Sequence, residues 1–398
     1  MPRVFFFVIF ISAIIVFFGL AQILLLRTLN RDWWRRRWIR RSAWSLPLIG
    51  LAFFVLFALG EYYQISWLGT TGSIVSVAAL VLEIGLMLTL PVSGAIHGLN
   101  KLLDFISKRH APRLKTTDHN RRLFLKGAAA AVPVVSIATG LTGVGRAFAP
   151  ADVYRRPMTI KNLPPALEGL RILHLSDLHL RHYITLETVE QIVDDARSLK
   201  PDLVLMTGDV ADDLTRLGDV TRVMASLAPR LGVYASMGNH EYFRGPEQVR
   251  RIYEASPVRL LINEGVAMDV DGTPLYVGAI DDPRAMSGLR PDFFNRTLDI
   301  TLADRGSDVT TVLMSHRPDA FPYASERGVH LTLAGHTHGG QIGLFGRSLL
   351  EEALPEKYLW GEYTLGDARL YTSCGAGHWF PFRLGCPAEA PVIELTRA

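Results

Sequence analysis

The stretch Arg171-Ile-Leu-His-Leu-Ser-Asp-Leu-His179 runs from apolar residues directly into a carboxylate and an imidazole. A short apolar run that is bounded by polar residues predicts a buried β-strand. Asp177 and His179 stand two residues apart at the end of this strand, so both side chains can face the same side. The same pattern, a buried strand that ends in polar residues, recurs along the rest of the chain.

Four later apolar runs also end in carboxylate, amide or imidazole side chains. They are Asp202–Thr207 before Asp209, Val233–Met237 before Asn239, Thr310–Met314 before His316, and Val329–Ala334 before His336 and His338. Between the first two strands, Leu186–Leu199 repeats its apolar positions at helical spacing. The alternation of strand and helix predicts an α/β fold, and folds of this class place their sites at the carboxyl ends of strands. We therefore expect the five strand ends to share one site.

The residue types at these strand ends suit a metal site. Carboxylate, amide and imidazole side chains are ligands for Mn, Fe or Zn. A single histidine is more often a core or surface residue, and we interpret His174, between Leu173 and Leu175, in that way. Five strand ends that all carry ligand-type residues are hard to obtain by chance, so together they predict metal binding.

The blocks Asp-x-His, Gly-Asp, Gly-Asn-His-Glu, His and Gly-His-x-His resemble the calcineurin-like metallophosphoesterase superfamily in type, order and approximate spacing. The resemblance covers Leu170 to the C-terminus, and Ala334–Ile342 in particular is similar to the membrane-associated bacterial branch. It implies a four-layer α/β/β/α sandwich. The second block reads Gly208-Asp-Val-Ala-Asp-Asp-Leu214, without the Gly-Asp-x-x-Asp-Arg-Gly of protein Ser/Thr phosphatases, which argues against that subtype.

The same resemblance implies a role for each matching residue. Two divalent metal ions (Mn, Fe or Zn) would have seven ligands: Asp177, His179 and His338 on the first, Asn239, His316 and His336 on the second, and Asp209 on both. A hydroxide between the ions would attack phosphorus in line, which makes the bridging Asp209 a catalytic residue. His240 would be the second catalytic residue, as a general acid or by stabilising the transition state. Glu241 is expected to orient His240, and Asp212 and Asp213 are expected to lie just outside the ligands.

Residues 1–150 carry almost all of the apolar excess that gives the 398-residue chain its mean hydropathy of +0.20. Four segments in this part are long enough to span a bilayer core of ~30 Å as helices. They are Val4–Leu26, Trp44–Gly60, Ile74–Ile96 and Gly127–Ala149. For the second and third, a buried or re-entrant hairpin is the alternative. The sequence thus predicts an all-helical membrane anchor, residues 1–150, followed by a catalytic domain, residues 151–398.

Basic residues predict the orientation of the four segments. Seven Lys and Arg residues lie in the first loop and eight in the third, whereas Glu61–Thr71 contains none. Basic loops stay in the cytoplasm, so we expect a multi-pass protein of the cytoplasmic membrane with its catalytic domain on the extracytoplasmic side. Residues 121–126, within Asn120-Arg-Arg-Leu-Phe-Leu-Lys126, resemble a twin-arginine export signal, which makes the export machinery a predicted partner. Alternatively, Arg121 and Arg122 only belong to the basic loop.

The charge of the chain does not indicate a nucleic-acid partner. The net charge is only +4, and no basic stripe interleaved with aromatic residues follows residue 150, so no nucleic-acid partner is predicted.

Three other residues have more than one interpretation. Glu83, inside the third segment, is a candidate functional residue, but a lipid contact, an oligomer contact or a protonated side chain without a function explains it equally well. Cys374 and Cys386 either form one disulfide or remain two buried thiols.

Together these expectations describe a membrane-anchored phosphoesterase. It would hydrolyse a phosphomonoester or phosphodiester of a small molecule, or of a lipid-linked or envelope substrate. One alternative is a catalytically inactive binding or sensor module that keeps the fold, and another is a transporter with an attached regulatory domain. The presence of all seven ligands and of His240 favours the enzyme, because function is argued from the site.

Overall fold

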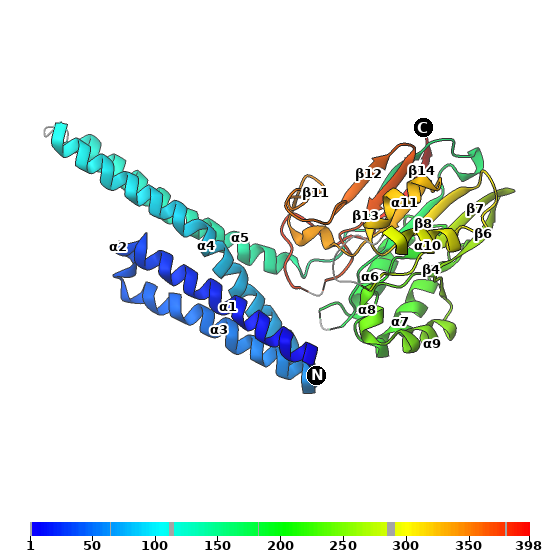
Figure 1. Cartoon of the computed structure of the whole chain (residues 1–398), viewed down its shortest axis with the longest axis horizontal. Helices are drawn as coiled ribbons and strands as arrows, with labels where there is room; N and C mark the ends of the chain where they lie inside the picture. Colours follow the sequence, from blue (N-terminus) through cyan, green and yellow to red (C-terminus); the bar gives the residue numbers. More distant parts are fainter. Residues whose placement is uncertain (1, 64, 111–114, 182, 285–290, 379) are drawn as a thin grey trace. The chain divides into compact units, whose positions relative to one another are not determined.

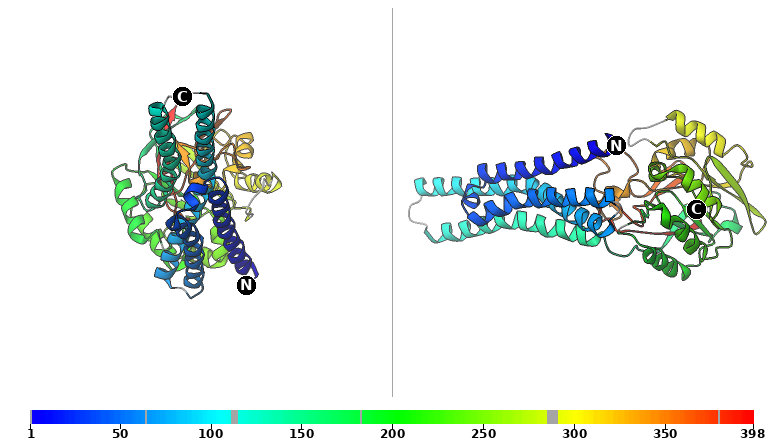
Figure 2. Two further views of the ribbon diagram at one scale, coloured as in Figure 1. Left: turned by 90° about the vertical axis from the view of Figure 1, so that its left-hand side faces the viewer. Right: turned by 90° about the horizontal axis from the view of Figure 1, so that it is seen from below.

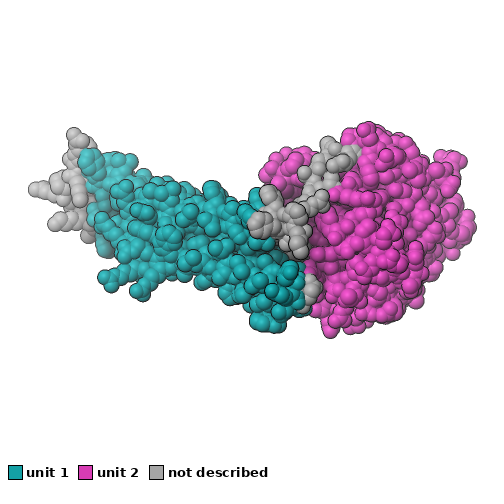
Figure 3. All heavy atoms as spheres, turned by 60° about the horizontal axis from the view of Figure 1, so that its bottom comes forward, with its two compact units in different colours: residues 1–146, 380–384 teal, residues 147–379, 385–398 magenta. Residues whose placement is uncertain are grey.

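The computed structural model describes residues 2–63, 65–110, 115–181, 183–284, 291–378 and 380–398. The chain forms two compact units, which Figure 3 colours separately: residues 1–146 with 380–384, and residues 147–379 with 385–398. The first unit is helical, and the second combines sheets with helices.

Five helices, four of them long, make up most of the described part of the first unit (Figure 1). They are α1 Pro2–Thr28, α2 Arg31–Trp34, α3 Arg37–Tyr63, α4 Ser66–His110 and α5 Lys115–Arg146. Four of these helices are long and apolar enough to cross a membrane, as the sequence predicts: α1, α3, α4 and α5. The second and third predicted spans belong to continuous helices, and the fourth helix ends at Arg146, three residues before its predicted end.

Helix α4 packs against both α3 and α5 (Figure 2). Small residues let α3 and α4 approach closely, because a Cβ on Gly60 would collide with the backbone of Gly69, and a Cβ on Gly72 with that of Phe57. Small residues at helix crossings are typical of packing in an apolar environment, where the hydrophobic effect does not drive association. This packing is therefore consistent with helices that lie in a bilayer.

Two polar features of the helical unit were already notable in the sequence. Glu83 is fully buried, and neither of its carboxylate oxygens has a hydrogen-bond partner among the described residues. Arg121 and Arg122 both pair with Asp104 on α4, at 2.5 and 2.8 Å. These contacts show a structural use of the two arginines, while their role in export stays a prediction.

Two six-stranded sheets form the core of the second unit. The first sheet has the order β1-β14-β2-β3-β4-β5, with β1 Arg155–Ile160, β14 Val392–Arg397, β2 Arg171–Leu175, β3 Leu203–Met206, β4 Val233–Ala235 and β5 Arg259–Leu260. The second has the order β12-β13-β9-β8-β7-β6, with β12 Gly361–Leu365, β13 Ala368–Thr372, β9 Leu331–Ala334, β8 Thr310–Met314, β7 Thr273–Ala279 and β6 Glu264–Val270. A small ribbon pairs β10 Gly343–Leu344 with β11 Arg347–Ser348.

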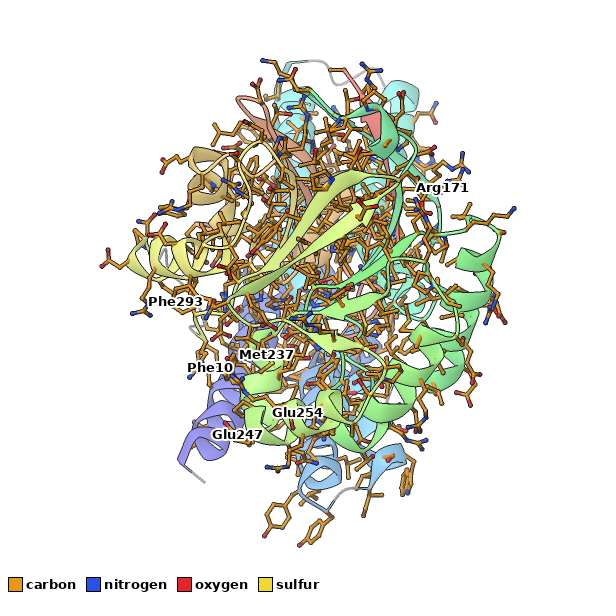
Figure 4. All side chains as sticks on the ribbon, turned by 90° about the vertical axis from the view of Figure 1, so that its right-hand side faces the viewer. Phe10, Arg171, Met237, Glu247, Glu254 and Phe293 are labelled. Carbon is orange, nitrogen blue, oxygen red and sulfur yellow. The ribbon has the colours of Figure 1, made fainter. Side chains whose placement is uncertain are left out.

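Helices cover the outer faces of both sheets. The first sheet carries α6 Leu186–Arg197, α7 Leu214–Ala225 and α9 Pro246–Glu254, and the second carries α10 Pro291–Thr301 and α11 Phe321–Glu326. Figure 4 labels Phe293 on α10 and Glu247 and Glu254 on α9, which lie on opposite sides of the double sheet. In β3, Leu205 is buried between the sheets and Val204 against the helices, as the period of two along a strand requires. The expected α/β/β/α sandwich is confirmed.

The predicted strands lie in the middle of these sheets, and they run parallel to their neighbours except where β2 pairs antiparallel with β14. Leu175 of β2 pairs with Met206 of β3, Met206 with Ala235 of β4, and Met314 of β8 with Leu333 of β9. Parallel strands have their carboxyl ends at the same edge of a sheet, so the residues that follow β2, β3 and β4 meet there. The residues after β8 and β9 meet in the same way on the second sheet.

Candidate metal centre

The seven predicted ligands all lie at carboxyl ends of strands. Asp177 and His179 follow β2, Asp209 follows β3, Asn239 begins the short helix α8 Asn239–Arg244 after β4, His316 follows β8, and His336 and His338 follow β9. Five of them have a positive φ, between 47° and 71°: Asp177, His179, Asp209, His336 and His338. Non-glycine residues rarely adopt this conformation, and such strain is concentrated at functional sites.

Two glycines of the motifs are required by close approach. Gly208 has a φ of 84°, and a Cβ at this position would overlap the backbone of Gly238. A Cβ on Gly335 would overlap the side chains of Ser176 and Asp177. The glycines therefore let the strand ends come together with their ligand side chains between them.

The first group of ligands consists of Asp177, His179 and His338, all buried. His179 Nε2 lies 3.1 Å from His338 Nε2 and 3.8 Å from Asp177 Oδ1. Asp177 Oδ2 accepts hydrogen bonds from the Ser176 hydroxyl and the His336 N–H, whereas Oδ1 has no hydrogen-bond partner among the described residues. Two imidazole nitrogens and a bare carboxylate oxygen around one point are a donor set for a cation.

The second group consists of Asp209, His316 and His336. His316 Nε2 lies 3.2 Å from His336 Nδ1 and 3.3 Å from Asp209 Oδ2. Asn239 joins this group, because its Oδ1 lies 3.1 Å from the same His316 nitrogen.

Asp209 stands between the two groups. Its Oδ2 lies 3.3 Å from His316 Nε2 and 3.6 Å from His179 Nε2, and its Oδ1 accepts a hydrogen bond from the His240 N–H at 2.9 Å. A neutral imidazole has one nitrogen that can accept a hydrogen bond or bind a metal. Where such nitrogens face one another beside carboxylates, a cation can bind all of them at once, whereas a proton can be shared by only two. The residues present thus fit two adjacent cations with one carboxylate in common.

The charges of the site move its pKa values in opposite directions. Burial lowers the pKa of His179, but the hydrogen bond to Asp212 and the charges of the nearby carboxylates outweigh burial and raise it to about 9. Burial also lowers the pKa of His316, and the charge and hydrogen bond of Asp209 outweigh it, raising the pKa to about 10. In turn, burial raises the pKa of Asp209, but the charge of His316 holds it well below its usual value. Without a cation, the carboxylates keep protons on His179 and His316.

We expect metal binding to release protons and its affinity to increase with pH. A histidine must lose its proton to become a ligand, and the pKa values of about 9 for His179 and about 10 for His316 leave both protonated at neutral pH. Protons therefore compete with the metal ion for these two imidazoles at low pH, and this competition ends as the pH rises through the two pKa values. For each proton released, the Mn²⁺ affinity should rise about tenfold per pH unit between about pH 6 and pH 8. Calorimetry in buffers of different ionisation enthalpy measures the protons released; an affinity that is constant over this range would contradict the expectation.

His240 is oriented by an aspartate outside the ligand set. Its Nδ1 lies 2.6 Å from Asp212 Oδ1, and its Nε2 lies 4.0 Å from Asp209 Oδ2. Asp212 also contacts His179 Nδ1 at 3.3 Å and accepts from Arg244 Nε at 3.0 Å. A carboxylate on Nδ1 determines the tautomer of a histidine, so Asp212 orients one ligand and His240 together. The His240 side chain is 19% exposed, so its ring can be reached from solvent.

Glu241 does not have the role that the sequence predicts for it. Its two carboxylate oxygens accept hydrogen bonds from the backbone N–H groups of Asp209, Val210 and Gly238, at 2.8–2.9 Å. With both oxygens engaged by backbone, Glu241 holds the turn after β3 against the turn after β4, and Asp212 rather than Glu241 contacts the His240 ring.

Asp213 is likewise corrected. It is the N-cap of α7, where its Oδ1 accepts from the Thr215 N–H at 3.0 Å. The side chain beside the ligands is that of Asp212, one residue earlier. Sequence alone does not separate two adjacent aspartates, because the direction of each side chain depends on where the helix begins.

Arg317 and Asp282 belong to the site although the sequence did not point to them. Arg317 is buried, its Nε donates to Asp282 Oδ2 at 2.8 Å, and its Nη1 lies 2.9 Å from His336 Nε2. Arginine only donates, so this His336 nitrogen accepts. The single hint in the sequence is that Arg317 directly follows His316.

The remaining candidates have structural roles. His174 is fully buried beside the Thr207 hydroxyl, and burial lowers its pKa to about 3, as befits a core residue. Cys374 and Cys386 are both buried thiols, the second of the two alternatives. The Cys386 thiol donates to the carbonyl of His338 at 3.4 Å.

Comparisons with known proteins show which family this chain resembles. Residues 170–340 match the family model described as calcineurin-like phosphoesterase. The chain is 29% identical over 286 residues to YkuE, an uncharacterized metallophosphoesterase of Bacillus subtilis, covering 69% of this chain and 97% of that protein. It is 26% identical over 337 residues to a Danio rerio transmembrane protein with metallophosphoesterase domain, covering 82% and 74%. A Helicobacter pylori uncharacterized metallophosphoesterase is 31% identical over 245 residues, covering 59% and 63%.

Solved structures are similar at lower identity. A 5'-nucleotidase precursor from Thermus thermophilus aligns with a TM-score of 0.37 and 17% identity, over 52% of this chain and 49% of that chain. A dimetal phosphatase from Danio rerio aligns with a TM-score of 0.34 and 12% identity, over 52% and 88%. This chain matches about half the length of the first of these two.

Proposed function

Because the chain carries a calcineurin-like metallophosphoesterase domain and is a metal-dependent phosphoesterase, we propose that it works with two divalent ions and is anchored in a membrane. The observation that carries the two-ion proposal is the position of Asp209. Its Oδ2 lies within 3.6 Å of an imidazole nitrogen from each ligand group. A shared carboxylate is what two neighbouring cations require.

The seven ligands divide as their positions suggest. Asp177, His179 and His338 would hold one ion, Asn239, His316 and His336 the other, and Asp209 both. Such ions, whether Mn, Fe or Zn, activate an attacking water and offset the charge on phosphoryl oxygens. We assign residues 151–398 as the catalytic domain.

Two other side chains would act on the substrate. His240, held at Nδ1 by Asp212, presents Nε2 and would donate a proton to the leaving oxygen. Arg317 would contact a phosphoryl oxygen: if His336 binds an ion through Nδ1, its Nε2 carries the proton and no longer accepts from the guanidinium. Asp282 would keep the released guanidinium beside the site.

The anchor supports a substrate class and a location. The four apolar helices would keep the site near a bilayer, and the basic loops favour the extracytoplasmic side. We therefore propose a phosphomonoester or phosphodiester of a lipid-linked or other envelope molecule as the substrate, and export through the twin-arginine machinery.

We expect the full-length protein, purified in detergent, to hydrolyse an aryl phosphodiester when Mn²⁺ is supplied. EDTA should abolish turnover, and added Mn²⁺ should restore it, because the proposed reaction depends on metal ions to activate the attacking water and to offset the charge on the phosphoryl oxygens. Nitrophenolate release measures turnover, and elemental analysis counts bound ions. A protein that holds two ions per chain and turns over neither an aryl monoester nor an aryl diester would disprove the proposed activity.

A further inference from the structure

The helical unit contains a groove of about 470 Å³ between its long helices. Its lining comes mainly from α1, α3, α4 and α5, together with Trp33 of α2 and Arg36, which precedes α3. It is mostly apolar, with Leu86 of α4 and Val134 of α5 as typical members. A groove of this kind on four membrane-type helices needs an apolar occupant, since empty apolar space forfeits dispersion contacts.

The groove has the depth of one leaflet. Along α3 its lining residues extend from Trp38 to Ile49, a length of about 17 Å at ~1.5 Å per helical residue. The hydrocarbon core of a bilayer is ~30 Å thick, so one leaflet contributes about half of that. The dimensions fit a single acyl chain that lies along α3.

One end of the groove is marked by charge and by aromatic rings. Arg36, Trp33 and Trp38 line this end, where α3 begins. Tryptophan is enriched at the level of lipid headgroups, so this end corresponds to the membrane surface. Among the described residues Arg36 has no ion pair, and Asp32, the acidic residue of α2, pairs with Lys101 at 3.8 Å.

We propose that this groove is a binding site for an anionic phospholipid, with one acyl chain along α3 and the phosphate at Arg36. The positive charge at this end favours an anionic headgroup. Arg36 lies close in sequence to four other arginines that have no ion pair in the described part of the chain: Arg35, Arg37, Arg40 and Arg41. Basic pockets between membrane helices recognise anionic headgroups in this way. The inference rests on the proposed membrane anchoring and does not depend on the phosphoesterase activity.

The test is native mass spectrometry of the delipidated full-length protein titrated with phosphatidylglycerol or phosphatidylcholine. We expect one tightly held phosphatidylglycerol per chain, with an affinity about fivefold above that of phosphatidylcholine, as one cation near the headgroup provides. Arg36→Gln should remove this preference, and Val134→Trp should block the groove and remove the bound lipid.

Each variant has a matched control nearby in the chain. Arg41→Gln removes the same charge outside the groove lining, and Val135→Trp adds the same ring at a position as exposed as Val134, 61% against 62%. Equal binding of the two lipids, or equal losses in variants and controls, would overturn the proposal. Turnover of an aryl phosphodiester is measured on the same samples to separate the two claims. If the unmodified protein turns over the diester but does not prefer phosphatidylglycerol, only the proposed lipid site is refuted. If it binds phosphatidylglycerol as expected but shows no turnover, only the proposed phosphoesterase activity is refuted.

Discussion

The Asp209→Asn protein is expected to lose about 10³-fold in kcat/KM for an aryl phosphodiester, because two ions that share a ligand supply several kcal/mol of transition-state stabilisation. Asparagine has the same shape but offers one neutral oxygen where the carboxylate offers two charged ones. Asp209 lies between the ligand groups, at 3.3 Å from His316 and 3.6 Å from His179, so both ions should be affected. Elemental analysis should find fewer than two ions per chain.

Asp213→Asn is the matched control for this substitution. It makes the same chemical change four residues away, at the N-cap of α7, where asparagine and aspartate are equally good caps. Its kcat/KM and its thermal midpoint should both stay near those of the unmodified protein. An Asp209→Asn protein with two ions and more than a tenth of the normal activity would refute the bridging role.

The second large effect is expected at His240. His240→Gln should lower kcat by about 10²-fold or more, the usual contribution of a general acid, while the number of bound ions stays the same. The loss should be greater for an alkyl phosphoester than for a nitrophenyl ester, because a poor leaving group depends more on protonation. Steady-state kinetics with both substrates, together with ion counts, make the comparison.

His330→Gln provides the control for His240. His330 lies at the amino end of β9, the end away from the ligands, where its Nδ1 accepts from the Thr311 N–H at 3.2 Å. Its replacement should leave kcat unchanged for both substrates. Equal losses at His240 for good and poor leaving groups would show that His240 stabilises charge and does not donate the proton. Loss of a bound ion would show that it acts as a ligand.

Much of the second unit could be predicted from local sequence. The strands that bear the ligands are short apolar runs, and each is followed by small or polar residues. Their ends therefore lie within two residues of the predicted ends, and those of β8 coincide with them. No other strand was predicted, and the physical reason is clear for the edge strands β1, β6 and β12. They are half exposed and less apolar, and a partly buried strand has a weaker pattern than one that is buried on both faces.

The seven candidate ligands could be proposed from sequence because they combine chemical type with strand position. Asp212 could not be distinguished from Asp213, since only the start of α7 decides which of the two points toward His240. Arg317 could not be found either, because its contact with His336 joins the ends of two strands that are separate in sequence.

The sequence by itself determined the kind of chemistry: apolar runs that end in Asp, Asn and His, and a separate N-terminal part apolar enough for a bilayer. Both are local properties of composition and period, which the chain carries whether or not it is folded. The tertiary structure decided what those residues do together. It places Asp209 between two ligand groups, turns Asp212 toward His240, and leaves a groove between helices whose lining residues lie far apart in the chain. Such relations depend on distances between segments, and only packing sets those distances.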